Sequence, residues 1–224
     1  MINVDKIMKI SNVRVYGMEE SIIASGYPMQ SKPVMDIDDM EEAHRLEVVN
    51  KGYKRARNLG SAEAGSGHDC YLKGIITQFD LQAPEYFWRQ FDRYHFRDYV
   101  SSQSKMHMIL KFDIDQMCNK YVSFMTIEVL KFYIDQYNNF EEGKFEEMEL
   151  RDGTKIPYTK ENCFNMVVAN IPSGFMLTAR ITTNYLQLKG IRKQRKHHKL
   201  QEWHIFNDFL SQLPSFDELT NKKK

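Results

Sequence analysis

The 224-residue sequence contains few cysteines and no closely spaced pair of them. Cys70, Cys118 and Cys163 lie far apart, so the sequence offers no cysteine-based zinc site. A small, odd number of cysteines is typical of the reducing cytoplasm, where we expect this protein to be located. No stretch approaches the roughly 18 apolar residues that a membrane span needs. The N-terminus lacks a basic segment followed by an apolar one, so we expect neither a membrane span nor a signal peptide.

The sequence also lacks an excess of charge of either sign. Its 31 Lys and Arg residues nearly balance 30 Asp and Glu residues, which argues against a general nucleic-acid-binding protein. Hydrophobic residues make up 42%, an ordinary composition for a globular protein of this length. Because no repeat, low-complexity tract or clear linker interrupts the chain, we expect residues 1–224 to form a single domain.

Several well-known catalytic motifs are missing as well. There is no Gly-x-Ser-x-Gly, no phosphate-binding P-loop and no Gly-x-Gly-x-x-Gly. His95, His197 and His198 lack the spacing of a His-Glu-x-x-His zinc site, so we predict no metal site. The sequence therefore lacks the common signatures of hydrolases, nucleoside triphosphatases and dinucleotide-binding enzymes.

The patterns that are present predict a chain of alternating helices and strands. Strands are expected at 8–16, 21–28 and 72–82, and a hairpin at 141–155 turning at Asp152-Gly153. Thr159 and Asn162 are both candidate N-caps for the helix expected at 158–170. Helices are expected, from apolar residues at helical spacing and capping signals, at 38–59, 84–97, 113–140, 158–170, 175–188 and 200–213.

Two basic segments stand out, 89–107 and 180–199. Each mixes Arg or Lys with Asn, Gln, Ser or His. Arginine binds phosphate through two parallel hydrogen bonds, hydroxyl and amide groups bind the edges of a base, and aromatic rings stack on a flat ring. We predict that the two segments converge into a pocket for a phosphate and a polar ring, although each alone also suits a solvated helix face.

The first segment and the residues before it carry a family resemblance. His68 follows Gly67, a strand and Ala83-Pro84 come next, and Arg89-Gln90 precedes Arg93 by the spacing Arg-Gln-x-x-Arg. Ser104 then follows. This order resembles the flavin-dependent thymidylate synthases, which have a Gly-His turn, an Arg-Gln-x-x-Arg-His-Arg helix and a Ser-x-Asn-Glu-x-Ser-x-Arg-Tyr segment.

The second segment is similar to another part of the same family. Residues 178–189 resemble Asn-x-Arg-Ser-Leu-x-Asn-Phe-Leu-x-Leu-Arg, and His198 with Glu202 resembles His-Ala-Gln-x-Glu-Ile. With gaps, the resemblance runs from about residue 20 to 215. It implies an α/β (α+β) fold with a mixed sheet flanked by helices and a helical C-terminal half.

The resemblance also implies a function. Members of the family are homotetramers that bind FAD between subunits and methylate dUMP at C5, with methylenetetrahydrofolate and NADPH as co-substrates. Carried over to this sequence, the catalytic residues are Arg93, Ser104 and Lys189. The implied cofactor-binding residues are His68, Arg93, Tyr94, His95, Asn184 and His198. The implied substrate-binding residues are Gln90, Ser101, Ser102, Gln103, Ser104, Lys105, Arg180, Lys189 and Arg195.

The sequence departs from the family pattern at polar positions of the site. The family's Arg-His-Arg is here Arg93-Tyr94-His95, its Asn-Glu is Ser101-Ser102, and Met106 replaces an arginine. Each lost charge-assisted contact weakens binding by about 1.5–3 kcal/mol. Two alternatives therefore stay open: a non-catalytic protein of the same fold that binds a nucleotide or flavin, and a nucleic-acid-binding protein that uses the basic run 192–199.

Overall fold

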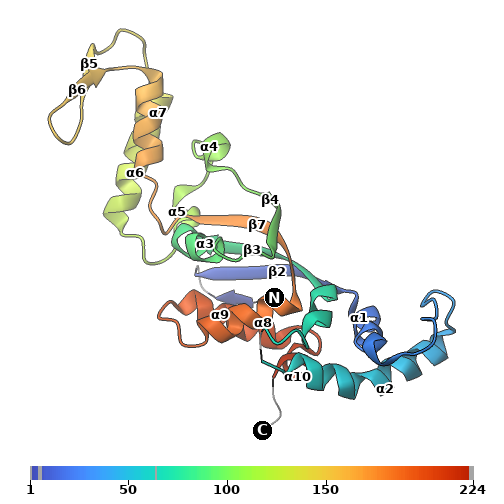
Figure 1. The fold of residues 1–224 in the computed structure, drawn as a ribbon. Coiled ribbons are helices and arrows are strands. Elements are labelled where there is room, and N and C mark those ends of the chain that lie inside the picture. Colours follow the sequence, from blue (N-terminus) through green and yellow to red (C-terminus); the bar gives the residue numbers. More distant parts are fainter. Residues whose placement is uncertain (1, 5–6, 64, 222–224) are drawn as a thin grey trace.

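The computed structural model describes residues 2–4, 7–63 and 65–221. At its centre lies a five-stranded sheet (Figure 1). Its strands, in spatial order, are β1 (Ile2–Val4), β2 (Met8–Tyr16), β3 (Ile76–Pro84), β7 (Met176–Asn184) and β4 (Arg97–Ser102). Each neighbouring pair is antiparallel, which corrects the expectation of a mixed sheet.

Helices surround this sheet and extend from it. They are α1 (Met18–Ala24), α2 (Glu42–Gly60), α3 (Glu85–Phe91), α4 (Lys105–Met108), α5 (Ile114–Met117), α6 (Phe124–Asn138), α7 (Lys160–Ala169), α8 (Tyr185–Arg195), α9 (Gln201–Gln212) and α10 (Phe216–Thr220). A separate hairpin joins β5 (Glu147–Glu149) to β6 (Lys155–Pro157).

Several local sequence signals are confirmed. The strand at 8–16 is β2, and the helix expected at 200–213 is α9. The side chain of Thr159 accepts a hydrogen bond from the amide of Asn162 and so caps α7. The Asp152-Gly153 turn is also present, with Gly153 at a φ of 83°, a conformation that glycine adopts without strain. These features depend on residues close together in sequence.

The prediction of a helix at 175–188 is wrong. Residues 176–184 form β7, which lies between β3 and β4, and only the end of the range belongs to α8. Ile181 and Thr183 are buried while Arg180 and Thr182 are partly exposed, the period of two that a strand requires. The C-terminal half is therefore not entirely helical, because pairing with two neighbouring strands outweighs local helix preference.

Three further expectations are corrected. Residues 21–28, expected as a strand, lie mainly in α1 and a following turn of 3-10 helix, with Ile22 and Ile23 both buried. Helix 84–97 stops at Phe91, since Arg97 onward pairs with β7. Helix 113–140 is broken into α5 and α6 by residues 118–123, where Cys118 bridges to Phe175.

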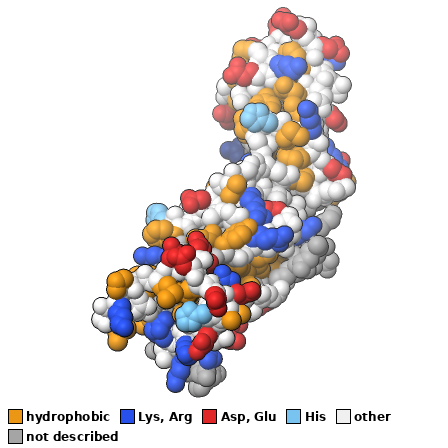
Figure 2. Space-filling view, turned by 90° about the vertical axis from the view of Figure 1, so that its right-hand side faces the viewer, with side chains coloured by type: hydrophobic (Ala, Val, Ile, Leu, Met, Phe, Trp, Pro, Cys, Tyr) orange, Lys and Arg blue, Asp and Glu red, His pale blue; other side chains and the backbone are white. Residues whose placement is uncertain are grey.

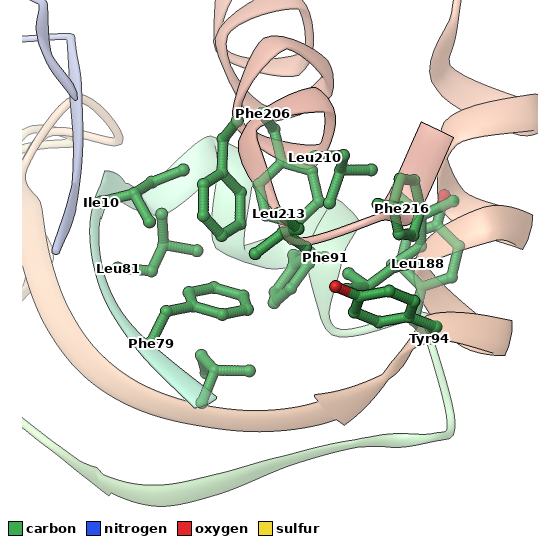
Figure 3. Close-up of a cluster of buried hydrophobic side chains, with 14 of the residues drawn as sticks. Ile10, Phe79, Leu81, Phe91, Tyr94, Leu188, Phe206, Leu210, Leu213 and Phe216 are labelled. Atoms are coloured by element: carbon green, nitrogen blue, oxygen red, sulfur yellow. The ribbon is translucent and has the colours of Figure 1, made fainter. Parts of the chain in front are cut away.

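One face of the sheet is covered by helices and holds the main core. Figure 1 shows α8, α9 and α10 below the sheet. In Figure 3, Phe79 and Leu81 of β3 point toward Phe206 and Leu210 of α9. The ring centroids of Phe79 and Phe209 are 5.2 Å apart in an edge-to-face arrangement, which favours aromatic pairs.

The other face of the sheet is polar. Gln78 and Asp80 on β3 lie beside Arg180 and Thr182 on β7, and Gln78 donates a 3.0 Å hydrogen bond to the Thr182 hydroxyl. These side chains are only partly buried. A sheet with one apolar and one polar face leaves charged groups available for a ligand or a partner.

A second, smaller hydrophobic cluster lies outside the sheet. It joins α5, α6, α7 and residues near Phe175, with Leu130 and Val167 fully buried. In Figure 1 the helices α6 and α7 project away from the sheet as an arm that ends in the β5–β6 hairpin. No helix in the described part of the chain is both long and apolar enough to cross a bilayer.

Candidate functional site

Two adjoining hollows lie between α8 and the connection from α3 to β4. Their volumes are about 550 and 460 Å³, and Phe96, Gln187 and Gln194 line both. We call this combined space the α8 groove. The remaining lining residues are Lys73, Arg93, Tyr94, His95, Asn184, Leu186, Gly190 and Arg195.

Contacts on both sides of the connection 92–96 fix its path. Arg97 is almost fully buried, donates a 2.7 Å hydrogen bond to Asp92 and lies 4.4 Å from the ring centroid of Tyr99. The Thr183 hydroxyl donates a 2.8 Å hydrogen bond to the carbonyl of Phe96. The Phe96 ring itself is 67% exposed, so it is available for stacking in the groove.

Arg195 forms the other wall of the groove. Its Nε donates a 2.7 Å hydrogen bond to the hydroxyl of Tyr94, and its guanidinium lies 4.7 Å from the ring centroid of Trp203. A guanidinium held over an aromatic ring keeps its charge and loses little freedom when an anion binds. Arg93 and His95, from the opposite segment, are exposed in the same hollow.

Gln90 and His198 lie behind this wall. The Trp203 indole donates a 2.8 Å hydrogen bond to Oε1 of Gln90, which fixes the amide. His198 Nδ1 accepts a hydrogen bond from the amide of Leu200 at 3.1 Å. Burial and then the positive charge of Arg195 hold the pKa of His198 below its usual range, so a neutral imidazole is favoured near neutral pH.

Asn184 ends β7 and begins α8. Its Oδ1 accepts a 2.9 Å hydrogen bond from the amide of Gln187, so the side chain acts as the N-cap. The same residue lines the groove. Of the sequence-predicted residues, the fold brings together Arg93, Tyr94, His95, Asn184 and Arg195, from segments about 90 residues apart in sequence.

Arg180 lies elsewhere, on the polar face of the sheet. It donates hydrogen bonds to the carbonyl of Asn12 at 2.7 Å and to Asp80 at 3.1 Å. Ser101 of β4 is its direct partner in the sheet register. These two predicted substrate residues are neighbours, but they do not line the α8 groove.

The segment 102–105 forms a third group. Ser104 caps α4, and its Oγ is 2.9 Å from Nδ1 of His107. Lys105 makes a 2.7 Å ion pair with Glu85. Gln103 exchanges hydrogen bonds with the backbone of Thr178, which extends the pairing of β4 with β7. Ser102 and Gln103 line a smaller hollow against Trp88.

Lys189 and His68 form a fourth group, on another side of α8. Lys189 Nζ is 2.6 Å from Oδ2 of Asp69, and this pair is 12% and 2% exposed. His68 is exposed in the turn just before Asp69. A separate hollow of about 920 Å³ borders Lys189. Its lining includes the basic residues Arg192, Lys193 and Lys196 and the acidic residues Glu63 and Asp208, so charges of both signs occur there.

Sequence reasoning missed six groove residues, Leu186 and Gly190 and four with polar or aromatic side chains. Gln187 and Gln194 are seven positions apart on one face of α8, Phe96 supplies an exposed ring, and Lys73 precedes β3. If the helix had been predicted to begin at Tyr185, the seven-residue spacing would have placed both glutamines on one helix face. No group of three or more His, Cys, Asp or Glu side chains in the described residues is arranged to hold a metal ion.

The α8 groove combines guanidinium groups, side-chain amides and an exposed aromatic ring. Guanidinium groups bind phosphate or pyrophosphate, amides pair with the donors and acceptors of a heterocycle, and Phe96 can stack on a flat ring. These donors and acceptors fit a ligand that has both an anionic part and a polar aromatic part.

Comparisons with known proteins agree on the fold. No protein-family model matches the sequence, and no curated protein matches it. Two crystal structures of the flavin-dependent thymidylate synthase ThyX from Helicobacter pylori, each with FAD and dUMP, are similar in structure. One has a TM-score of 0.64 at 11% identity, and the match covers 96% of this chain and 98% of that chain. The other has a TM-score of 0.63 at 10% identity, with 95% of this chain and 98% of that chain covered. The chain thus has a flavin-dependent thymidylate synthase-like α/β fold.

Proposed function

We propose that this chain is an enzyme of the flavin-dependent thymidylate synthase type. Its substrate is dUMP or a related pyrimidine nucleotide, which it methylates at C5 with methylenetetrahydrofolate and NADPH. The observation that carries the proposal is the α8 groove, where Arg93, His95 and Arg195 line one hollow and Asn184 lines the adjoining one. The residues of the two basic segments meet there in a fold that resembles ThyX over nearly its whole length. Because fold alone does not establish activity, this site chemistry is the main support.

The groove residues suit FAD as the cofactor. Arg93 and Arg195 would hold anionic groups, Asn184 would pair with the polar edge of the ring, and Phe96 would pack on its face. Bound FAD supplies hydride-transfer chemistry. The neutral imidazole of His198 lies behind Arg195 and avoids a second full positive charge beside it.

Five of the remaining predicted residues are assigned to the nucleotide. Ser101, Ser104 and Arg180 would bind it through hydroxyl and guanidinium donors, with Lys105 and Lys189 near its phosphate. These residues lie on other faces of the same subunit, away from the α8 groove. A complete site therefore requires groups from more than one subunit, in agreement with FAD bound between the subunits of a homotetramer.

An exposed apolar stripe supports such an assembly. Phe124, Met125, Val129 and Phe132 of α6 are all exposed, although α6 already packs its other side on α7. Figure 2 shows hydrophobic side chains across the upper part of the molecule, where the arm lies. Contiguous exposed apolar residues of this kind mark interaction surfaces.

We retain the predictions of a single domain and a cytoplasmic location.

Calorimetry with dUMP on FAD-loaded protein is the decisive test. We expect purified protein to show flavin absorbance, to bind dUMP and to oxidise NADPH in its presence. An Arg93→Ala/Arg195→Ala double variant should lose flavin, whereas Lys111→Ala, at an exposed position between α4 and α5, should retain it. Colourless protein that binds neither FAD nor dUMP would contradict the proposal.

One observation favours a second candidate, a non-catalytic nucleotide- or flavin-binding protein of the same fold. Lys189, which replaces the family's phosphate-binding arginine, is already neutralised by Asp69 at 2.6 Å. A lysine committed to a buried carboxylate has less charge to offer a phosphate. Protein that retains flavin but does not oxidise NADPH with dUMP would support this candidate over the enzyme.

A further inference from the structure

Asn12 of β2 has an unusual backbone conformation. Its φ is +52°, in the left-handed region that few residues other than glycine adopt, with asparagine among the more tolerant. The pairing of β2 with β3 shifts between Ser11 and Arg14, so Asn12 lies in a β-bulge. Bulges of this kind redirect a backbone group or side chain away from the regular ladder.

The bulge directs two groups of Asn12 toward one cluster. Its carbonyl accepts a 2.7 Å hydrogen bond from Nη1 of Arg180, and its Nδ2 donates to Oδ2 of Asp80. Asp80 in turn accepts a 3.1 Å hydrogen bond from Arg180 through its other oxygen. Asn12, Asp80 and Arg180 therefore form a closed ring of contacts across β2, β3 and β7.

Gln78 completes the support of the guanidinium. Its Oε1 accepts a 3.3 Å hydrogen bond from Nη2 of Arg180, and its amide nitrogen donates to Thr182. Burial opposes ionisation of Asp80, but the hydrogen bonds from Asn12 and Arg180 outweigh it and lower the pKa of the carboxyl group. Asp80 is thus a carboxylate near neutral pH and holds Arg180 by charge as well as geometry.

Arg180 nevertheless keeps hydrogen-bonding capacity. A guanidinium has five N–H groups, and the contacts to Asn12, Asp80 and Gln78 engage three of them. The Arg180 side chain is 26% exposed on the polar sheet face, opposite Ser101. An arginine fixed along part of its surface and open along the rest is arranged to bind an oxyanion, with little further loss of side-chain freedom.

We propose that Asn12 is a positioning residue for Arg180, holding the guanidinium in the orientation that binds an oxyanion of the nucleotide substrate. The inference rests on the proposed function for the identity of the ligand. The fixing of Arg180 by Asn12 is a property of the unliganded chain and has its own readout.

Three variants test the role of Asn12. Asn12→Ala removes the amide and disfavours the left-handed backbone, so it disturbs both contacts. Asn12→Gly retains that backbone and its carbonyl, and loses only the donor to Asp80. Arg180→Lys serves as the reference, and Asn58→Ala, an exposed asparagine on α2, is the matched control.

We expect dUMP binding to FAD-loaded protein, measured by calorimetry, to weaken about tenfold in Asn12→Ala and about threefold in Asn12→Gly. In turnover, the KM for dUMP should rise while kcat changes little. The Nε–Hε NMR signal of Arg180 is identified by its loss in Arg180→Lys. Its chemical shift should be that of a fixed side chain in the wild type and should move toward that of a mobile arginine in both Asn12 variants.

Each outcome has a clear meaning. If Asn12→Ala fails to fold, Asn12→Gly still tests the contact to Asp80. Wild-type dUMP affinity and an unchanged Arg180 signal in a folded Asn12 variant overturn the inference. Absence of dUMP binding by the wild type overturns the proposed function and the ligand assignment, whereas the NMR signal still decides whether Asn12 fixes Arg180.

Discussion

The Nε of Arg195 donates a 2.7 Å hydrogen bond to the hydroxyl of Tyr94, and this contact joins α8 to the connection between α3 and β4. Tyr94 is buried against Phe91 and Trp203, so its hydroxyl has a fixed position. In the family pattern Arg-His-Arg, a histidine occupies the position of Tyr94. In this chain the tyrosine at that position holds Arg195 at the edge of the groove.

Tyr94→Phe tests this contact. The ring stays in place and only the hydrogen bond is lost, so we expect the free energy of unfolding to fall by about 0.5–1.5 kcal/mol. Arg195 becomes less ordered, and flavin binding should weaken by about three- to tenfold. Urea denaturation and flavin titration measure the two effects. Tyr137→Phe, in the α6–α7 arm, is the control, and equal flavin affinity in both variants would contradict this role.

The Gln90–Trp203 hydrogen bond supplies a stability test. Trp203 is fully buried, and Trp203→Phe leaves the Gln90 carbonyl oxygen without its donor and creates a small cavity. We expect the free energy of unfolding to fall by about 2–4 kcal/mol. The double variant Trp203→Phe/Gln90→Met should be less destabilised than the sum of the single variants, because it removes both polar partners. Strict additivity in denaturant titrations would show that the two side chains are not coupled.

The Lys189–Asp69 pair separates a structural from a substrate-binding role. Each single variant, Lys189→Met or Asp69→Asn, leaves one buried partner without its counterpart and should lower the unfolding free energy by about 3 kcal/mol. The double variant should recover much of that loss. If Lys189→Met instead keeps its stability and loses dUMP binding, the lysine belongs to the substrate site.

His198 should titrate below its ordinary pKa. A folded-state pKa below the unfolded value means that this group stabilises the protein above the unfolded pKa, and the contribution is lost as pH falls through the folded value. His198→Gln should therefore reduce the acid sensitivity of folding. In Arg195→Gln, NMR titration should show a higher pKa for His198, since one cause of the shift is removed. An unchanged pKa would leave burial, with the smaller effect of His204, as the cause of the lowered value.

The exposed stripe of α6 predicts the effect of a charge on assembly. Val129→Glu and Phe132→Glu should reduce the mass measured by light scattering from that of the proposed tetramer to a smaller species, because a buried interface does not tolerate an unpaired charge. Glu161→Lys, an exposed residue of α7, should leave the mass unchanged. A stripe variant that keeps the wild-type mass and flavin content would exclude this surface from the interface.

Local signals in the sequence predicted local structure well. Thr159 caps α7, Asp152-Gly153 turns the small hairpin, and the 8–16 strand and the final long helix follow their hydrophobic patterns. In each case, the interactions that form the element join residues near in sequence or follow from one amphipathic face. The α/β fold was also predicted, through the colinear order of short motifs from His68 to Glu202.

The sequence by itself thus determined which residues carry the charge and which segments are amphipathic, and it indicated the overall fold. Only the tertiary structure decided that 176–184 is a central strand, because its pairing with β3 and β4 is nonlocal. Tertiary structure also decided which cations remain available. Arg93 and Arg195 face a groove, Arg180 is held by Asn12 with part of its guanidinium open, and Lys189 is paired with the buried Asp69. The charge of a side chain is fixed by its chemistry, but its partners depend on which distant segments the fold brings within hydrogen-bonding distance.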